Sequence, residues 1–166
     1  MAKIVMWVAQ KGFRDEELFG PLDHFRKMGH DVTVVSHDEG VAKSKFGKTI
    51  DVCSLKNVCI DDVDALLLVG GPGTYDYVDD ALLHDYVRWA HDEKRLVGAI
   101  CYAPNILAKT GIMHGIRSAV SSDFTVTREG AICTGNSVEV DGDIITADGP
   151  TSALNWAKEI DAHLRK

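Results

Sequence analysis

The sequence predicts an α/β fold in which a mostly parallel sheet carries helices on both faces. Short apolar runs, typical of strands that are covered on both sides, alternate along the chain with stretches whose apolar residues recur every three or four positions. The 166 residues are enough to bury a core without a metal or a disulfide, and they contain no linker, domain break or internal repeat. We therefore expect residues 1–166 to form one domain.

Strands are expected where a short apolar run is bounded by turn-forming residues. Four runs predict the parallel strands: Ile4–Ala9, Asp31–Ser36, Asp64–Val69 and Arg95–Ile100. Weaker signals predict short strands near Ser118–Ser121 and Ala131–Cys133, a hairpin over Val138–Ile145 that turns at Asp141-Gly142, and a hairpin within residues 37–61.

The helices are indicated by apolar residues that fall on one face. In the first helix, over Asp15–Met28, acidic residues occupy the first turn, where the helix dipole favours them, and Gly29 follows as a C-terminal stop. Three further helices are expected, over Asp79–Glu93, Tyr102–Lys109 and Thr151–Leu164.

The charge balance excludes several classes of function. The formal net charge is −7, and Lys and Arg are not clustered as binding to nucleic acids or anionic lipids requires. The one basic cluster, Lys43, Lys45 and Lys48, has the character of a solvated loop. No apolar run approaches the roughly 20 residues that cross a bilayer, and no secretory signal is recognisable. We therefore expect a cytoplasmic protein with no nucleic-acid or membrane partner.

The four cysteines show neither a CxxC pair nor a histidine at metal-ligand spacing. Free thiols are therefore expected, and no metal or other cofactor is implied. Cys53 and Cys59 would pair only under oxidation, whereas the apolar surroundings of Cys133 predict a core position. The fourth, Cys101, has a distinctive place because it directly follows a predicted strand.

Cys101 is the strongest candidate for chemistry. The loops after Ala9, Val69 and Ile100 are expected to converge at the carboxyl edge of the sheet. There Cys101 would lie on a sharp turn before a helix, whose dipole would lower the pKa of the thiol. The alternative is that Cys101 is a small buried residue at a strand end.

Backbone amides near Cys101 predict an oxyanion hole, in which N–H groups stabilise a developing negative oxygen. The amide of Tyr102 follows the cysteine on the turn, and a second donor is expected from the Gly70-Gly71 loop after the neighbouring strand. Because glycines have no side chain, this loop allows a substrate to approach the backbone closely.

The residues around Cys101 read Ala99-Ile100-Cys101-Tyr102-Ala103-Pro104 and are preceded along the chain by the Gly70–Gly73 loop. This combination resembles the nucleophile elbow of the ThiJ/PfpI superfamily, which includes the Parkinsonism-associated redox protein and archaeal intracellular peptidases. Gly12–Leu18 resembles the acidic N-terminal motif of that family, and Ile145–Ala153 resembles its C-terminal strand, turn and helix. Because these motifs occur in the right order over nearly the whole chain, the sequence is identified as a member of this superfamily.

The resemblance implies a flavodoxin-like three-layer sandwich related to class I glutamine amidotransferases, usually assembled as a homodimer, with larger oligomers possible. It also implies a partner for Cys101. Glu17 matches the carboxylic acid that hydrogen-bonds the nucleophilic sulfur, with Glu16 as the alternative if the alignment shifts by one residue. A protonated carboxyl could donate to a thiolate or to the sulfinate formed by oxidation.

The sequence departs from the family pattern where a histidine is expected. Peptidase members carry a histidine directly after the nucleophile, where this chain has Tyr102. They also take an acidic residue from a neighbouring subunit, and the position that aligns with this residue is Tyr75, with Asp76 beside it. The redox branch supplies a histidine after the elbow helix, where this chain reads Ala119-Val120-Ser121-Ser122. Most of the seven histidines are expected to be solvated, and His114 is the least implausible base.

Three functions follow from these residues. The first is a cysteine-dependent enzyme in which Cys101 and Glu17 act on small reactive carbonyl compounds, as in the glyoxalase and deglycase activities of the family. The second is an oxidative-stress sensor or chaperone-like protein in which Cys101 is oxidised. The third, an intracellular peptidase or amidase, needs an imidazole that the sequence does not supply.

Overall fold

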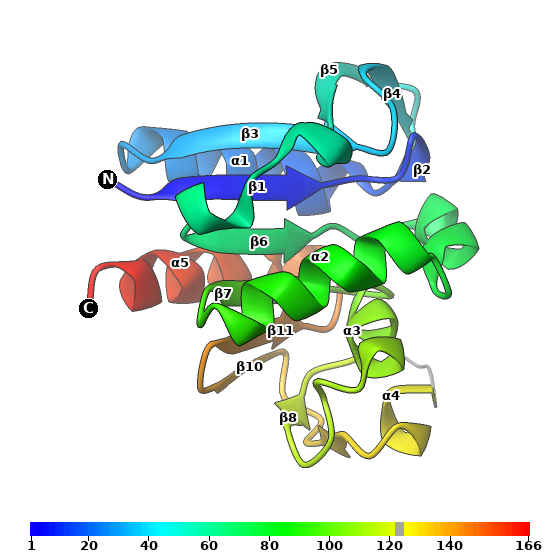
Figure 1. The fold of residues 1–166 in the computed structure, drawn as a ribbon, viewed down its shortest axis with the longest axis vertical. Helices are drawn as coiled ribbons and strands as arrows, with labels where there is room; N and C mark the ends of the chain where they lie inside the picture. The colour runs from blue at the N-terminus through cyan, green and yellow to red at the C-terminus, as the bar shows by residue number, and fades with distance from the viewer. Residues whose placement is uncertain (122–124) are drawn as a thin grey trace.

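The computed structural model describes residues 1–121 and 125–166 (Figure 1). Nine strands of this part form one mixed sheet, in the order β10-β11-β7-β6-β1-β3-β5-β4-β2. Its centre is five parallel strands: β3 (Asp31–Ser36), β1 (Lys3–Trp7), β6 (Ala65–Leu68), β7 (Leu96–Ile100) and β11 (Ile144–Ala147). If these five strands alone are numbered 1 to 5 as they follow one another along the chain, their order across the sheet is 2-1-3-4-5. This is the strand order of flavodoxin-like folds, which confirms the predicted fold class.

Helices cover both faces of the sheet and complete three layers. In Figure 1, α2 (Ala81–Asp92) lies in front of the sheet, whereas α1 (Asp15–Lys27) and α5 (Ala153–Leu164) lie behind it. Apolar residues of α1 and α5 share one core with the sheet, and those of α2 and α3 (Pro104–Thr110) share the other. Both faces of the central sheet are therefore buried from solvent, as the apolar sequences of its strands predict.

Strand β1 illustrates how the alternation of side chains fills both cores. Ile4 and Met6 point into the core beneath α1 and α5, and Val5 and Trp7 point into the core beneath α2. All four are at most 5% exposed. Such burial on both faces is the reason why the run lacks the polar alternation of a half-exposed strand.

The remaining elements are short and lie mostly at the edges. The strands are β2 (Lys11–Phe13), β4 (Gly40–Ser44), β5 (Thr49–Ser54), β8 (Arg117–Ser118), β9 (Ile132–Cys133) and β10 (Val138–Asp141), with α4 over Thr125–Arg128. Short 3₁₀ segments occupy Leu55–Asn57, Ile60–Asp62, Pro72–Tyr77 and Pro150–Ser152. The two predicted hairpins are confirmed as β4–β5 and β10–β11.

Some sequence-based predictions differ from the structure. The helix expected over Tyr102–Lys109 begins only at Pro104, because the residues after Cys101 form a turn before the helix. Strand β2 was not predicted, since three residues with a central glycine carry no periodic signal. Cys133 is exposed rather than in the core, because β9 pairs only with β8, away from the main sheet.

Candidate active site

The candidate active site lies at the carboxyl edge of the sheet, where β6 and β7 end side by side. Cys101 directly follows β7, and its N–H donates to the carbonyl of Ala147 at the end of β11 (2.9 Å). Gly70 follows β6 closely, and its carbonyl accepts from the N–H of Arg14, the residue before α1 (2.9 Å). The predicted convergence of these loops is confirmed.

Cys101 occupies a strained turn. Its φ is +64°, in the left-handed region that residues with a Cβ rarely adopt. The turn is closed by a hydrogen bond from the Ala103 N–H to the Ile100 carbonyl (3.1 Å), and the cysteine is half-buried. This geometry is that of a nucleophile elbow, in which a sharp strand-to-helix turn presents the nucleophile at the top of a sheet.

Glu17 lies against the cysteine from the first turn of α1 and is completely buried. Its Oε2 accepts from the N–H of Gly70 (3.2 Å), whereas Oε1 is buried with no hydrogen-bond partner among the described residues. Burial raises the pKa of Glu17 to about 7, against the lowering influence of hydrogen bonds from Cys101 and Gly70. Glu16, the sequence-based alternative, instead pairs with Arg14 at the surface (2.6 Å).

The pKa of Cys101 shifts in the direction opposite to the expected one. Burial and the neighbouring Glu17 carboxylate raise it to about 12, and the hydrogen bond from the Tyr102 amide lowers it only in part. The helix behind the cysteine starts three residues later and has only seven residues, so its dipole contributes little. Cys101 is therefore activated only when Glu17 holds the proton of the pair.

The two groups titrate together. The pair loses its first proton near pH 7, and the remaining proton resides mainly on the sulfur, whose pKa is the higher of the two. When this proton moves to Glu17, the carboxyl can donate to a thiolate on Cys101, since the two side chains are hydrogen-bonded to each other. Glu17 is thus both the partner and the proton reservoir of the nucleophile.

The expected oxyanion donors are only partly in place. The Tyr102 N–H hydrogen-bonds the Cys101 sulfur, so it lies beside the position of an attacked carbonyl oxygen. The sequence predicts that the Gly70 N–H donates to an oxyanion, but in the structure this N–H already donates to Glu17. Gly71, whose φ is +127°, lines the pocket at Cys101 and is the remaining candidate.

A small pocket of about 180 Å³ opens over Cys101. It is lined by Arg14, Glu17, Lys45, Gly71, Pro72, Tyr75, Cys101, Tyr102 and Pro150. The Tyr75 ring meets the Tyr102 ring edge-on, with centroids 4.0 Å apart. Asp76 and His114 do not line this pocket, and His114 instead packs against Gly130.

Sequence reasoning missed two contributors to the site. Lys45, expected in a solvated loop, lines the pocket, because β4 runs beside β2 and brings the following residue to the sheet edge. Ser121 hydrogen-bonds the Cys101 sulfur from the segment in which the redox branch carries a histidine. The neighbouring Ser122 of that motif lies outside the described residues.

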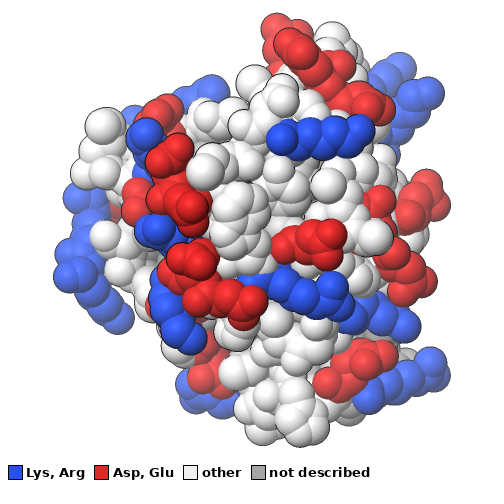
Figure 2. Space-filling model, in the orientation of Figure 1, with Lys and Arg blue, Asp and Glu red and all other residues white. Residues whose placement is uncertain are grey.

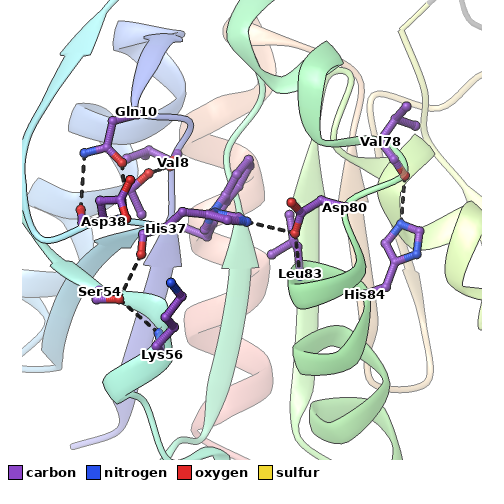
Figure 3. A network of polar contacts seen from close by, with 12 residues as sticks. Val8, Gln10, His37, Asp38, Ser54, Lys56, Val78, Asp80, Leu83 and His84 are labelled. Carbon is purple, nitrogen blue, oxygen red and sulfur yellow. Dashed lines mark hydrogen bonds and ion pairs between the residues drawn. The ribbon is translucent and has the colours of Figure 1, made fainter.

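Four of the seven histidines, His30, His37, His84 and His163, have hydrogen-bond partners among the described residues, and of the seven only His114 is exposed, contrary to the expectation that most are solvated. Figure 3 shows His37 pointing at Asp80, with its Nε2 donating to Oδ1 (2.8 Å), and His84 donating to the Val78 carbonyl (2.7 Å). His30 is buried, accepts from the Ala2 N–H (3.0 Å) and donates to Asp161 (2.6 Å). Among the described residues, no histidine lines the pocket over Cys101.

Within the described ranges, no group of three or more His, Cys, Asp or Glu side chains is arranged to hold a metal ion. None of the helices in these ranges combines the length and apolar character needed to cross a membrane. Figure 2 shows acidic and basic side chains interspersed on the face it presents. This mixed face fits the low clustering of Lys and Arg noted in the sequence.

The doubly wound fold, with a half-buried cysteine beside a buried carboxyl at the carboxyl edge of the sheet, defines a class of α/β proteins. A family model for the DJ-1/PfpI family matches residues 2–162, and the chain belongs to this family. It is similar to an uncharacterized protein of Methanocaldococcus jannaschii, with 35% identity over 96% of this chain and 80% of that protein. A deglycase of Thermococcus kodakarensis is 30% identical over 97% of this chain and 99% of that protein.

A solved structure agrees with this assignment. The crystal structure of a ThiJ/PfpI domain protein from Brachyspira murdochii superposes with a TM-score of 0.96 and 28% identity, covering 98% of this chain and 96% of that chain. The near-complete coverage on both sides shows that the shared fold extends over the chain.

Proposed function

We propose that this protein is a cysteine-dependent enzyme that acts on small reactive carbonyl compounds, such as 2-oxoaldehydes, in the manner of a glyoxalase or deglycase. The observation that carries the proposal is the buried Glu17, whose pKa is raised to about 7 directly beside the Cys101 sulfur. A carboxyl with this pKa can both donate and accept a proton at neutral pH, as carbonyl chemistry on a cysteine requires.

The reaction can be written with these groups alone. The Cys101 thiolate adds to the aldehyde carbon, a carbon–sulfur bond forms, and the carbonyl oxygen takes the proton of Glu17. The resulting Glu17 carboxylate removes the proton of the former aldehyde carbon and returns it to the neighbouring carbon through an enediol. The product is a thioester of a 2-hydroxy acid. Water hydrolyses the thioester and restores the thiol, so the net change is the addition of one water.

Two observations favour this activity over the alternatives. Similar proteins, including the one from Thermococcus kodakarensis, are named deglycases. Peptidase members of the family use a histidine beside the nucleophile, and none of the described residues that line the pocket is a histidine. A sensor in which Cys101 is oxidised uses the same pair, so only turnover separates it from an enzyme.

The test is the loss of methylglyoxal and the appearance of the 2-hydroxy acid, measured with metal-free protein after its reductant has been removed. We expect turnover by the wild type and by Cys53→Ser, a control that removes an exposed thiol. Cys101→Ser is expected to be inactive, and Glu17→Gln at least tenfold slower. Equal rates in the wild type and Cys101→Ser would overturn the proposal. Absence of turnover, together with a gain of two oxygens on Cys101 in mild peroxide, would favour the sensor.

A further inference from the structure

The mouth of the Cys101 pocket carries two cations in a chain whose net charge is −7. Arg14 precedes α1 and Lys45 follows β4, so two separate segments bring these side chains to one opening. An acidic protein repels anions overall, and a local pair of cations is the feature that would reverse this repulsion at the site.

One aromatic ring holds both cations in place. The Phe46 ring lies 5.1 Å from the Arg14 guanidinium carbon and 5.4 Å from the Lys45 ammonium nitrogen, both within cation–π range. Phe46 itself is 62% exposed, which is unusual for a large apolar side chain in a loop and is explained by these two contacts. The ring thus offsets part of the repulsion between two like charges.

The cations are only partly neutralised. Glu16 engages Nε and Nη2 of Arg14 (2.6 and 3.5 Å), which leaves Nη1 without a partner among the described residues. Lys45 has no carboxylate within 4.0 Å in the same part of the chain. One guanidinium nitrogen and one ammonium group therefore remain to bind an anionic group at the pocket.

The size of the pocket limits what this anion can be. Its volume of about 180 Å³ is below the range of roughly 300–1,000 Å³ that drug-sized ligands occupy. At roughly 30 Å³ for each water-sized group, about six non-hydrogen atoms fit. A carbonyl with an attached carboxylate fills this space, whereas a phosphorylated sugar exceeds it.

We propose that Arg14 and Lys45 form a carboxylate-binding subsite, so that the preferred substrates are small carbonyl compounds that carry a carboxylate next to the reactive carbon. This inference rests on the proposed function, because it names the substrate class of the same cysteine. With such a compound, the guanidinium and ammonium groups hold the carboxylate at the mouth, and the aldehyde carbon faces the Cys101 sulfur.

The test compares alkylation of Cys101 by iodoacetate and iodoacetamide, which differ only in a carboxylate and a neutral amide of similar size. In both reactions the thiolate displaces iodide, so the ratio of the two rate constants at one pH is independent of the thiol pKa. Cys53 and Cys59, both exposed, supply the reference ratio within the same protein. We expect the Cys101 ratio to exceed this reference about fivefold or more, since one unit charge at 4 Å in water contributes about 1 kcal/mol.

Matched variants assign the preference to the two cations. Arg14→Gln and Lys45→Gln are each expected to lower the ratio severalfold, Arg14→Lys to retain it, and Glu16→Gln to raise it. Lys43→Gln is the control, because Lys43 lies in β4, two residues before Lys45, and does not line the pocket. A ratio at Cys101 equal to that of Cys53, or an equal loss in Lys43→Gln, would overturn the inference. Methylglyoxal turnover is measured separately, so the subsite can hold while the proposed reaction fails, or the reverse.

Discussion

The Gly70 N–H donates to Glu17 Oε2 at 3.2 Å, so the backbone at the end of β6 holds the carboxyl group that faces Cys101. This single bond joins α1 to the strand beside the nucleophile. It satisfies Oε2 of Glu17, whereas Oε1 is buried with no hydrogen-bond partner among the described residues. The chemistry proposed for the site depends on this relationship, and three predictions follow from it.

The reactivity of Cys101 should follow the titration of the pair. In the wild type we expect the rate of alkylation by iodoacetamide to rise through pH 7, where the pair loses its first proton. In Glu17→Gln the carboxylate that raises the pKa of Cys101 is gone whereas the burial remains, so the thiol should titrate alone in one step below pH 12, and the rise near pH 7 should disappear. Peptide mass spectrometry separates Cys101 from the other thiols.

Glu16→Gln is the control for this profile, because Glu16 is exposed and contacts Arg14 instead of the cysteine. Its profile should keep the rise near pH 7. A Glu17→Gln profile that coincides with the wild type would show that the carboxyl and the sulfur titrate independently.

The stability of the protein should fall as Glu17 ionises. Its pKa is about 7 in the folded state and near 4.5 in the unfolded state, so the stabilisation is complete below pH 4.5 and is lost as the pH rises through 7. The shift corresponds to a loss of about 3 kcal/mol in the free energy of unfolding. Glu17→Gln removes this dependence and should be more stable than the wild type at pH 8, but not at pH 4.5.

Urea unfolding of reduced protein at the two pH values measures this difference. Glu16→Gln is again the reference, since Arg14 lowers the pKa of Glu16 and any effect of that variant has the opposite sign. If the difference in free energy of unfolding between the wild type and Glu17→Gln stayed constant between pH 4.5 and pH 8, the Glu17 carboxyl would be ionised throughout that range.

A side chain at Gly70 should disrupt the site. A Cβ there would lie 2.6 Å from the Ile100 carbonyl and 2.8 Å from the Cys101 Cβ, with no room for either backbone to move freely. We expect Gly70→Ala to lower the free energy of unfolding by about 1–3 kcal/mol, as overpacking does, and to lower the alkylation rate of Cys101.

Gly20→Ala is the matched substitution. Gly20 lies within α1 with no atom within 4 Å of the added Cβ, so the change should stabilise the helix by up to about 1 kcal/mol. Both variants are compared by urea unfolding and by iodoacetamide kinetics. Equal effects of the two substitutions on Cys101 would mean that the Gly70 backbone does not position the pair.

The parallel sheet, the main helices and the position of the cysteine after a strand could all be predicted from local patterns in the sequence. Apolar runs such as the one through β6 and the three- to four-residue spacing in α1 are local patterns, and burial on one or two faces produces them directly. The pairing of Glu17 with Cys101 came from resemblance to a family, since a first-turn glutamate is otherwise common.

The electrostatics of the site could not be predicted from local patterns, because they depend on how distant segments pack. The pKa of Cys101 is raised rather than lowered because burial and Glu17 outweigh a short helix that starts three residues later. Lys45 reaches the pocket because β4 pairs beside β2, a contact between segments far apart in the chain. The spacing of residues along a sequence indicates which face of its own helix or strand a side chain occupies. The burial of a titratable group and the charges beside it, which set its pKa, depend instead on which elements pack together.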